Sequence, residues 1–319
     1  MNKSAPTADK PVTPAAKPPA PETVPHGYVI TKPVAGSNIP ADYTFVLTRD
    51  EIYVPIAVRR PAGNGLFPVI TMGFGEGKHG MLKVEDLVSR LAPMQDRMIA
   101  RGYAVATVNY RNEIPYAYLQ TDHAPENLPD NISGDQRTLK SQPTLDHQDL
   151  IAIWRYLGTL PFVDKGAIGA MGVSHSGEMI LKAASEFQIA AAVCIEAAAH
   201  EFLEVNTGPT APRNGSQIQY NDVEVARANA DKAKAMRRVR RISTPLLIFG
   251  RDHDHLQGIF RLTHEWLREA GKDSSWISFD HHVHGYVYAF GSARPDAIQE
   301  KAFQVFMGFF DKHLKRAAR

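Results

Sequence analysis

The sequence predicts an α/β fold in which a mostly parallel central sheet carries helices on both faces. Short apolar runs of strand length alternate with segments of helical periodicity, which is the pattern of βαβ units. Hydrophobic residues make up 44% of the 319 positions, so the chain can bury a large core. The helices of βαβ crossovers lie over both faces of a sheet. We therefore expect both faces to be covered, within one large domain.

The composition excludes several classes of protein. The formal net charge of +2 is nearly balanced and gives no reason to expect a nucleic-acid partner. Cys194 is the only cysteine, so an internal disulfide framework is excluded. No run of 18 apolar residues is present, and we expect no membrane-spanning helix. The sequence does not indicate an oligomeric state.

The first 25 residues differ from the rest of the chain. They are mostly Pro, Ala, Lys and Thr, a composition that cannot bury enough apolar surface to fold. We expect residues 1–25 to be a disordered linker and residues 26–319 to be the folded domain. The linker lacks the apolar stretch of a signal peptide, although such linkers often follow a removed signal or lipid anchor. Export to the periplasm or medium and retention in the cytoplasm therefore both stay open.

The first elements set the direction of the sheet. Asp42 to Leu47 and Ile52 to Arg59 are predicted strands joined by a tight turn, so they pair antiparallel. Phe67 to Met72 is an apolar strand that ends in a glycine-rich turn. A helix follows at Val84 to Met98, and Pro93 inside it is expected to kink the helix or to start a new one.

Alternation continues to the end of the chain. The expected strands and helices are, in order, strand 103–109, helix 144–157, strand 167–173, a helix from Ser176, strand 189–195, helix 222–238, strand 245–249, helix 256–270, strand 276–279 and helix 298–310. Two stretches without periodicity, at about 110–143 and 200–221, are expected to be loop insertions. Loops of this length are usually functional or disordered.

A serine lies in the turn between one predicted strand and the next helix. The motif is Gly172-Val173-Ser174-His175-Ser176-Gly177, in which Ser174 is the candidate nucleophile. Small residues are needed two positions before and after it, because larger side chains would collide with neighbouring backbone. Ser176 departs from the usual G-x-S-x-G pattern but is small. The alternative is a turn rich in small residues that has no chemical role.

A serine nucleophile needs a histidine base and an acid that orients the base. In strand–turn–helix sites these follow the serine in the order acid, then histidine. Asp254, after the strand 245–249, is the favoured acid; Asp252 and Glu196 are the other candidates, each of which also follows a strand. His284 is the favoured base, because it follows the last strand and Gly285 lets the loop approach the serine.

Histidines are frequent in these two loops, so a metal site is a competing hypothesis. His253, His255, His281 and His282 lie in loops at the same expected edge of the sheet. Tetrahedral zinc needs suitably spaced ligands and usually a carboxylate or cysteine among them. We favour His281 and His282 as solvated loop residues, and we expect no metal and no other cofactor.

Acyl transfer also needs N–H donors for the oxyanion that forms. The backbone N–H of His175 is one candidate, and Phe74 followed by Gly75 are the candidates for the second. Tyr110, Tyr116 and Tyr118 lie in the long loop after a strand end. They are predicted either to line a substrate pocket or to pack the loop onto the core.

Several motifs occur in the order seen in a known group of enzymes. They are Gly102-Tyr103-Ala104-Val105, Asn109-Tyr110-Arg111, Val163-Asp164, the turn at Ser174, Pro245-Leu246-Leu247-Ile248-Phe249-Gly250, and His284-Gly285-Tyr286. Over about residues 41–314 the chain resembles α/β-hydrolases of the dienelactone-hydrolase-like and prolyl-oligopeptidase-like group. The resemblance implies the α/β-hydrolase fold and a serine hydrolase that works through an acyl-enzyme.

Two departures from this group affect the expected substrate. Dienelactone hydrolases typically carry cysteine at the position of Ser174, and prolyl-oligopeptidase relatives usually carry a large extra N-terminal domain, for which this sequence shows no signal. We therefore expect a carboxylesterase that acts on a small or polymeric ester. A serine peptidase or an acyltransferase on the same triad, a metal-dependent hydrolase, and a non-catalytic binding protein of this fold are the alternatives.

Overall fold

Nine strands form the central sheet. The structure is a computed structural model that describes residues 29–49, 51–75, 80–111, 143–291 and 294–315. Its sheet has the strand order β1-β2-β3-β5-β4-β6-β7-β10-β11. The bounds are β1 (Ile30–Lys32), β2 (Ala41–Leu47), β3 (Tyr53–Arg59), β4 (Phe67–Phe74), β5 (Ala104–Val108), β6 (Val163–Val173), β7 (Ala191–Ile195), β10 (Leu246–Arg251) and β11 (Ser274–Phe279).

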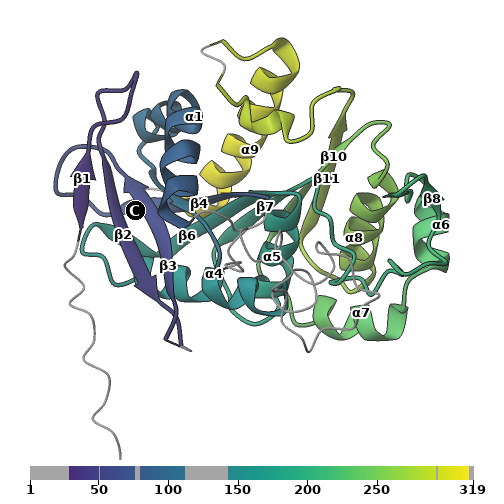
Figure 1. Ribbon diagram of the computed structural model, residues 1–319. Helices are drawn as coiled ribbons and strands as arrows, with labels where there is room; N and C mark the ends of the chain where they lie inside the picture. The colour runs from purple at the N-terminus through teal and green to yellow at the C-terminus, as the bar shows by residue number, and fades with distance from the viewer. Residues whose placement is uncertain (1–28, 50, 76–79, 112–142, 292–293, 316–319) are drawn as a thin grey trace, which may run out of the picture.

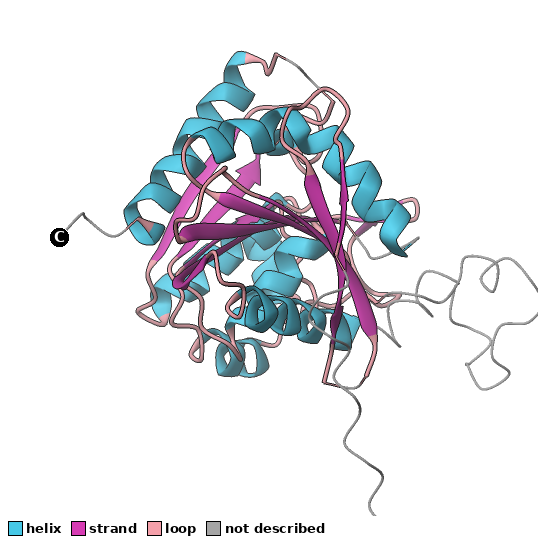
Figure 2. Ribbon diagram, turned by 90° about the vertical axis from the view of Figure 1, so that its left-hand side faces the viewer, coloured by secondary structure: helices cyan, strands magenta, loops and turns pink. Residues whose placement is uncertain are grey.

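The sheet has an antiparallel part and a parallel part. The pairs β1–β2, β2–β3 and β3–β5 are antiparallel, whereas β5, β4, β6, β7, β10 and β11 run parallel. This confirms the predicted parallel sheet with an antiparallel start. The sheet is strongly twisted, as Figure 2 shows. Because the six parallel strands share one direction, the loops that follow them meet at one edge of the sheet.

Helices cover both faces of the sheet, as an α/β fold requires (Figure 1). One face carries α1 (Gly80–Ala100) and α9 (Ala297–Leu314), and the other carries α4 (Pro143–Leu157), α5 (His175–Ala184) and α8 (Gln257–Glu269). Smaller elements are β8 (Arg213–Asn214), β9 (Gln217–Ile218), α6 (Val223–Ala228), α7 (Lys232–Val239) and the 3-10 turn η1 (Tyr286–Tyr288). Among the helices in the described ranges, none is long and apolar enough to cross a membrane.

Helix α1 continues through Pro93, where the sequence indicated a kink or a new start. Proline removes the hydrogen bond to the carbonyl four residues earlier, which belongs to Ser89. Both Ser89 and Pro93 are exposed, so water can solvate that carbonyl. Buried residues on both sides of the proline, including Leu87 and Met98, hold the two halves on the sheet as one helix.

The predicted helix at 222–238 is two helices instead of one. Asp222 caps α6 through the N–H groups of Glu224 and Val225, and Asp231 caps α7 through the N–H of Lys234. Aspartate accepts backbone N–H bonds readily, so it starts a helix better than it continues one. The second cap therefore divides the segment.

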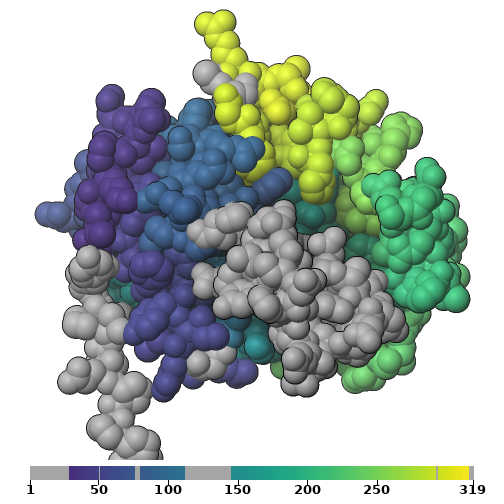
Figure 3. Space-filling model, in the orientation of Figure 1, coloured from purple at the N-terminus to yellow at the C-terminus, as the bar shows by residue number. Residues whose placement is uncertain are grey.

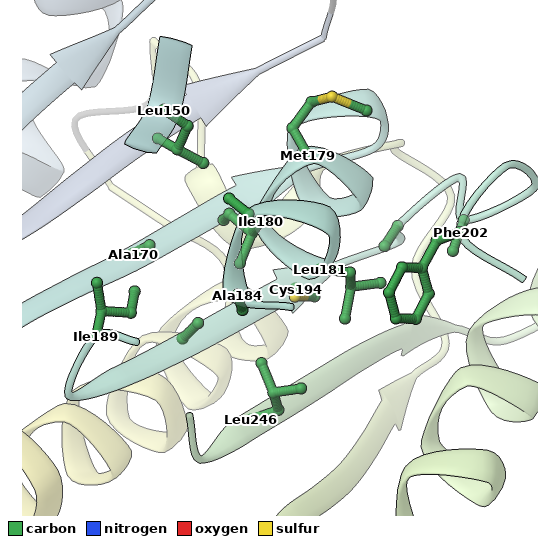
Figure 4. Close-up of a cluster of buried hydrophobic side chains, with 14 of the residues drawn as sticks. Leu150, Ala170, Met179, Ile180, Leu181, Ala184, Ile189, Cys194, Phe202 and Leu246 are labelled. Atoms are coloured by element: carbon green, nitrogen blue, oxygen red, sulfur yellow. The ribbon is translucent and has the colours of Figure 1, made fainter. Parts of the chain in front are cut away.

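The core beneath α5 fixes the position of the turn that precedes this helix. Figure 4 shows Met179, Ile180, Leu181 and Ala184 of α5 packed above the strands that carry Ala170, Cys194 and Leu246. All of these side chains are buried. Burial also raises the pKa of the Cys194 thiol, which is the state of a packing residue and not of a nucleophile.

Ion pairs join the C-terminal helix to α1 and to the residue that follows α1. Arg97 bonds Glu300 at 2.7 Å, and Arg101 bonds Asp311 at 3.0 Å. Figure 3 shows the yellow C-terminal segment beside the blue segment of α1 on the surface. The N-cap of α9, Asp296, also bonds His281 Nε2 at 2.9 Å, so this helix anchors the loop that carries His284.

Candidate active site

Ser174 lies in a sharp turn between β6 and α5. Its backbone angles are φ 60° and ψ −120°, a strained conformation for a residue with a side chain. A Cβ on Gly172 would lie 2.8 Å from the backbone carbon and oxygen of Ser176, so this position accepts only glycine. Ser176 is fully buried and donates its hydroxyl to the Gly75 carbonyl at 3.2 Å. Serine therefore fits where the usual pattern has glycine.

Backbone hydrogen bonds tie this turn to the end of β7. The Ser174 N–H donates to the Ile195 carbonyl at 2.9 Å, and the Ala198 N–H donates to the Ser174 carbonyl at 3.2 Å. Glu178 of α5 accepts the Phe202 N–H at 2.8 Å, and burial raises its pKa to about 7. The segment that carries Glu196 is thus fixed against the serine turn at several points.

Glu196 holds the imidazole of His284. Glu196 Oε2 lies 2.6 Å from His284 Nδ1, and Glu196 Oε1 accepts the Gly285 N–H at 3.0 Å. The Glu196 side chain is fully buried, whereas that of His284 is 44% exposed. Because a carboxylate can only accept, Nδ1 carries the proton and Nε2 is left to accept one. This is the tautomer that a serine nucleophile requires.

The prediction that Asp254 bonds His284 is wrong. Asp254 is brought close to the site, but its Oδ2 pairs with Arg251 and its Oδ1 accepts the Leu256 N–H at 2.7 Å. Burial opposes ionisation of Asp254, but hydrogen bonds from His255 and Leu256 and the charge of Arg251 outweigh burial, so its pKa lies below the usual value. The carboxylate is already satisfied by these partners.

Asp252, the second candidate acid, is also engaged elsewhere. Its Oδ1 accepts the Ser278 hydroxyl at 2.5 Å and faces Gln257 Nε2 at 3.5 Å. These contacts hold it against β11 and α8. Glu196 is therefore the one of the three candidate carboxylates that bonds His284 in the structure.

Three residues with positive φ and a side chain lie at this edge of the sheet. Ser174 (60°) follows β6, Glu196 (45°) follows β7, and His253 (62°) follows β10. Such conformations cost about 1–3 kcal/mol each and are found mainly where function holds them in place. Their position after three neighbouring strands makes this edge of the sheet the candidate functional edge.

The His284 loop lies against the serine turn. A Cβ on Gly285 would be 2.8 Å from Phe74 Cε2 and 3.2 Å from Val173 Cγ1, and the residue has φ 72°. His281, expected to be solvated, is buried and stacks on Tyr286 at 4.9 Å. Only glycine allows the loop to approach this closely.

The Gly285→Ala variant is expected to lose activity by roughly 10–100-fold, because the methyl group would push His284 away from the turn. The left-handed backbone adds about 1 kcal/mol of strain to the fold. Gly291→Ala is the matched control, since Gly291 has φ 67° with no atom within 4 Å of its added Cβ. Hydrolysis rates and melting temperatures of both variants check this. Equal activities would contradict the role of close approach.

The oxyanion donors expected from the sequence are brought to the same place. His175 is the first residue of α5, so its N–H has no partner within the helix. The Gly75 N–H donates to the Val173 carbonyl at 3.4 Å, so it is engaged in the sheet ladder and is the wrong choice for a free donor. Phe74, at the end of β4 and paired in register with Val173, remains the candidate for the second donor.

The His175 side chain does not point freely into solvent. It is mostly buried, and its Nε2 lies 2.9 Å from Asp146 Oδ2 of α4. The ring of Tyr110 contacts it edge to face at 6.0 Å. The contact between His175 and Asp146 joins α5 to α4 at the residue that carries the candidate donor.

The aromatic surroundings differ from those expected. Tyr110 is buried and packs against Ser176, so it is a core residue and not a pocket residue; Tyr116 and Tyr118 lie outside the described residues. Instead, Phe74 lies 6.4 Å from the His284 ring and packs edge to face on Phe290 at 4.6 Å. These distances are between ring centroids. The aromatic rings of Phe74 and Phe290 therefore lie beside the candidate base.

Of the four histidines considered as metal ligands, His281 contacts Asp296 and His255 contacts Asp254. Within the described residues, Glu196, Asp254 and His284 are the group whose potential ligand atoms all lie within 4.8 Å of one another. A cavity of about 490 Å³ lies at the opposite edge of the sheet, where Gly166 and Ala190 line it near the starts of β6 and β7.

Comparison with known proteins places the chain in a family. Residues 136–317, more than half of the chain, match the prolyl oligopeptidase family. No curated protein sequence matches the chain significantly.

Solved structures share the fold at low sequence identity. Acylaminoacyl peptidase from Pyrococcus horikoshii has a TM-score of 0.57 at 18% identity; the match covers 89% of this chain and 43% of that one. A putative dienelactone hydrolase from Klebsiella pneumoniae has a TM-score of 0.55 at 14% identity, covering 86% and 100%. A thermostable esterase from Pseudomonas putida has a TM-score of 0.58 at 14% identity, covering 88% and 85%.

The chain thus spans less than half the length of the peptidase that it resembles, and nearly all of the two shorter enzymes. The parallel sheet, the strained serine turn and the family match all point to one group. The chain belongs to the prolyl oligopeptidase family and has the α/β-hydrolase fold.

Proposed function

We propose that this protein hydrolyses carboxylic esters through an acyl-enzyme formed on Ser174. The observation that carries the proposal is the hydrogen bond between the buried Glu196 and His284 Nδ1, which leaves Nε2 as the base beside the serine turn. A serine becomes a useful nucleophile only when a base takes its proton.

The proposed reaction has two halves. The Ser174 hydroxyl oxygen attacks the ester carbonyl carbon while His284 Nε2 takes the hydroxyl proton. The N–H groups of His175 and Phe74 are proposed to hold the oxyanion. Collapse of the intermediate breaks the carbon–oxygen bond, and the alcohol leaves with the proton from His284.

Water then completes the cycle. It attacks the acyl carbon as His284 again takes a proton, and the carboxylic acid leaves as Ser174 recovers its hydroxyl proton. Throughout, Glu196 stabilises the positive charge that forms on His284. No further group is needed to balance the reaction, so we expect activity to survive treatment with a strong chelator.

The choice of esters over amides has separate support. The two solved enzymes that the chain spans nearly in full are described as an esterase and a putative dienelactone hydrolase. A peptidase activity is the second candidate, because the family match and the acylaminoacyl peptidase structure favour it.

The test compares one acyl group on two leaving groups. p-Nitrophenyl butyrate and butyryl p-nitroanilide differ only in the bond that is cleaved, so their kcat/KM values separate esterase from amidase activity. The proposal predicts a markedly higher kcat/KM for the ester. A higher value for the anilide, or cleavage of peptide substrates alone, would replace the esterase proposal by the peptidase.

A further inference from the structure

Two carboxylates, and not one, lie beside the candidate base. Glu196 follows β7 and Asp254 follows β10, and both side chains are at most 1% exposed. Each places an oxygen atom within 4.8 Å of a ring nitrogen of His284 and of the other carboxylate. Either could orient the imidazole by distance alone, so something else must decide between them.

Arg251 contacts both carboxylates. Its Nε donates to Glu196 Oε2 at 3.0 Å, on the same oxygen that accepts from His284 Nδ1, and its Nη2 pairs with Asp254 Oδ2. The guanidinium is itself largely buried, with 16% of the side chain exposed. Its planar fork fixes both contacts at once, which a flexible ammonium group cannot do.

The remaining atoms of Asp254 are also held away from the base. Its Oδ1 accepts the Leu256 N–H at 2.7 Å and lies 3.1 Å from His255 Nδ1. The loop is further fixed because Gln257 Oε1 accepts the Arg251 N–H at 3.1 Å. Without the guanidinium, two buried negative charges would face each other and repel, so neither carboxylate would be held in its present position.

We propose that Arg251 is a positioning residue that assigns Glu196 to His284 and holds Asp254 as its own counter-ion. The inference rests on the proposed role of His284 as base for Ser174, but not on the choice between ester and amide substrates. The charged and titratable groups that face Arg251 come from three segments: Glu196 after β7, Asp252, Asp254 and His255 after β10, and His284 and Tyr286 from the last loop.

The test measures how fast a fluorophosphonate labels Ser174 as a function of pH. In this reaction the serine oxygen bonds phosphorus, fluoride leaves, and His284 takes the proton, so the acid limb of the profile reports protonation of the base. Arg251→Gln removes a positive charge, so we expect the limb to move up by about one pH unit. The plateau rate should fall about tenfold, because Glu196 loses its fixed orientation.

Charge balance provides the decisive variant. Asp254→Asn alone removes a negative charge and should move the acid limb to lower pH. The double variant Arg251→Gln with Asp254→Asn restores the net charge, so its limb should return close to that of the wild type. A purely structural role for Arg251 predicts no such rescue.

Two more variants separate charge from geometry. Arg251→Lys keeps the charge but not the fork, so its limb should stay in place while its plateau falls. Arg227→Gln is the matched control elsewhere, because Arg227 also bridges two carboxylates, Glu224 and Glu265, but lies in α6. Its profile should match that of the wild type.

Each outcome decides the proposal. An unchanged limb in Arg251→Gln, or no return in the double variant, overturns it. If circular dichroism shows that Arg251→Gln does not fold, Asp254→Asn decides: a limb at lower pH supports the proposal, and an unchanged limb overturns it. Wild-type protein that is labelled at Ser174 but cleaves no ester would overturn the esterase proposal alone, whereas no labelling at all would overturn both.

Discussion

Replacing Ser174 by alanine is expected to lower kcat for ester hydrolysis by roughly 10⁶-fold, the size of loss seen when a serine hydrolase loses its nucleophile. The reason is that no acyl-enzyme can form without the hydroxyl oxygen. The Ser174 side chain makes no capping hydrogen bond, so the substitution should leave the fold intact. Initial rates on p-nitrophenyl butyrate, with circular dichroism as a fold check, measure the effect.

Ser176→Ala is the matched control for this experiment. Ser176 lies two residues further on and is fully buried, where its hydroxyl bonds the Gly75 carbonyl. Its loss should lower activity by no more than about tenfold, since only the packing of the turn is affected. A large loss in Ser176→Ala with little loss in Ser174→Ala would mean that the nucleophile has been assigned to the wrong serine.

The second large effect is expected for Glu196→Gln. The amide keeps the volume of the side chain but cannot hold His284 in the required tautomer, so kcat should fall by roughly 10³–10⁴-fold. The hydrogen bonds to His284 Nδ1 and the Gly285 N–H are the contacts that the change disturbs. Rates should be taken across pH, because a shifted optimum could otherwise hide part of the loss.

Asp254→Asn is the matched control for Glu196→Gln. Asp254 bonds Arg251 and the Leu256 N–H but not His284. Asp254→Asn should therefore lower kcat far less than Glu196→Gln does. Comparing the two variants at the plateau of their pH profiles decides between the acids. If Asp254→Asn lost more activity than Glu196→Gln, the acid would be the one that sequence reasoning favoured.

The fold could be read from the sequence because periodicity alone separates buried strands from amphipathic helices. The antiparallel start at 42–59 and the parallel strands that follow were predicted from this signal, and the structure confirms them. The continuous helix through Pro93 could not be predicted. The helix continues because of its tertiary contacts: packing on both sides of the proline outweighs one missing hydrogen bond.

Only part of the site could be predicted from the sequence, and the reason is physical. Ser174 and His284 stand out because a strained turn and a glycine-flanked loop leave local signals in the sequence. The acid leaves none, because Asp252, Asp254 and Glu196 each follow a strand at the same edge. Which one reaches the histidine depends on backbone direction and on partners far away in sequence, above all Arg251.

Arg251 itself was missed by sequence reasoning, although a signal exists. An arginine at the last position of an otherwise apolar, buried strand, directly before two aspartates, is an unusual placement. Long cationic side chains are rarely buried unless they are paired. Such an arginine indicates that carboxylates meet it at the sheet edge, which the structure shows.

The most direct test of the central claim is to identify the residue that a fluorophosphonate modifies in the wild-type protein. The protein is labelled, digested and sequenced by mass spectrometry. We expect one adduct, on Ser174, and a much slower reaction in Glu196→Gln. An adduct on another residue, or folded protein that takes up no label, would contradict the assignment of Ser174, His284 and Glu196 as the catalytic triad.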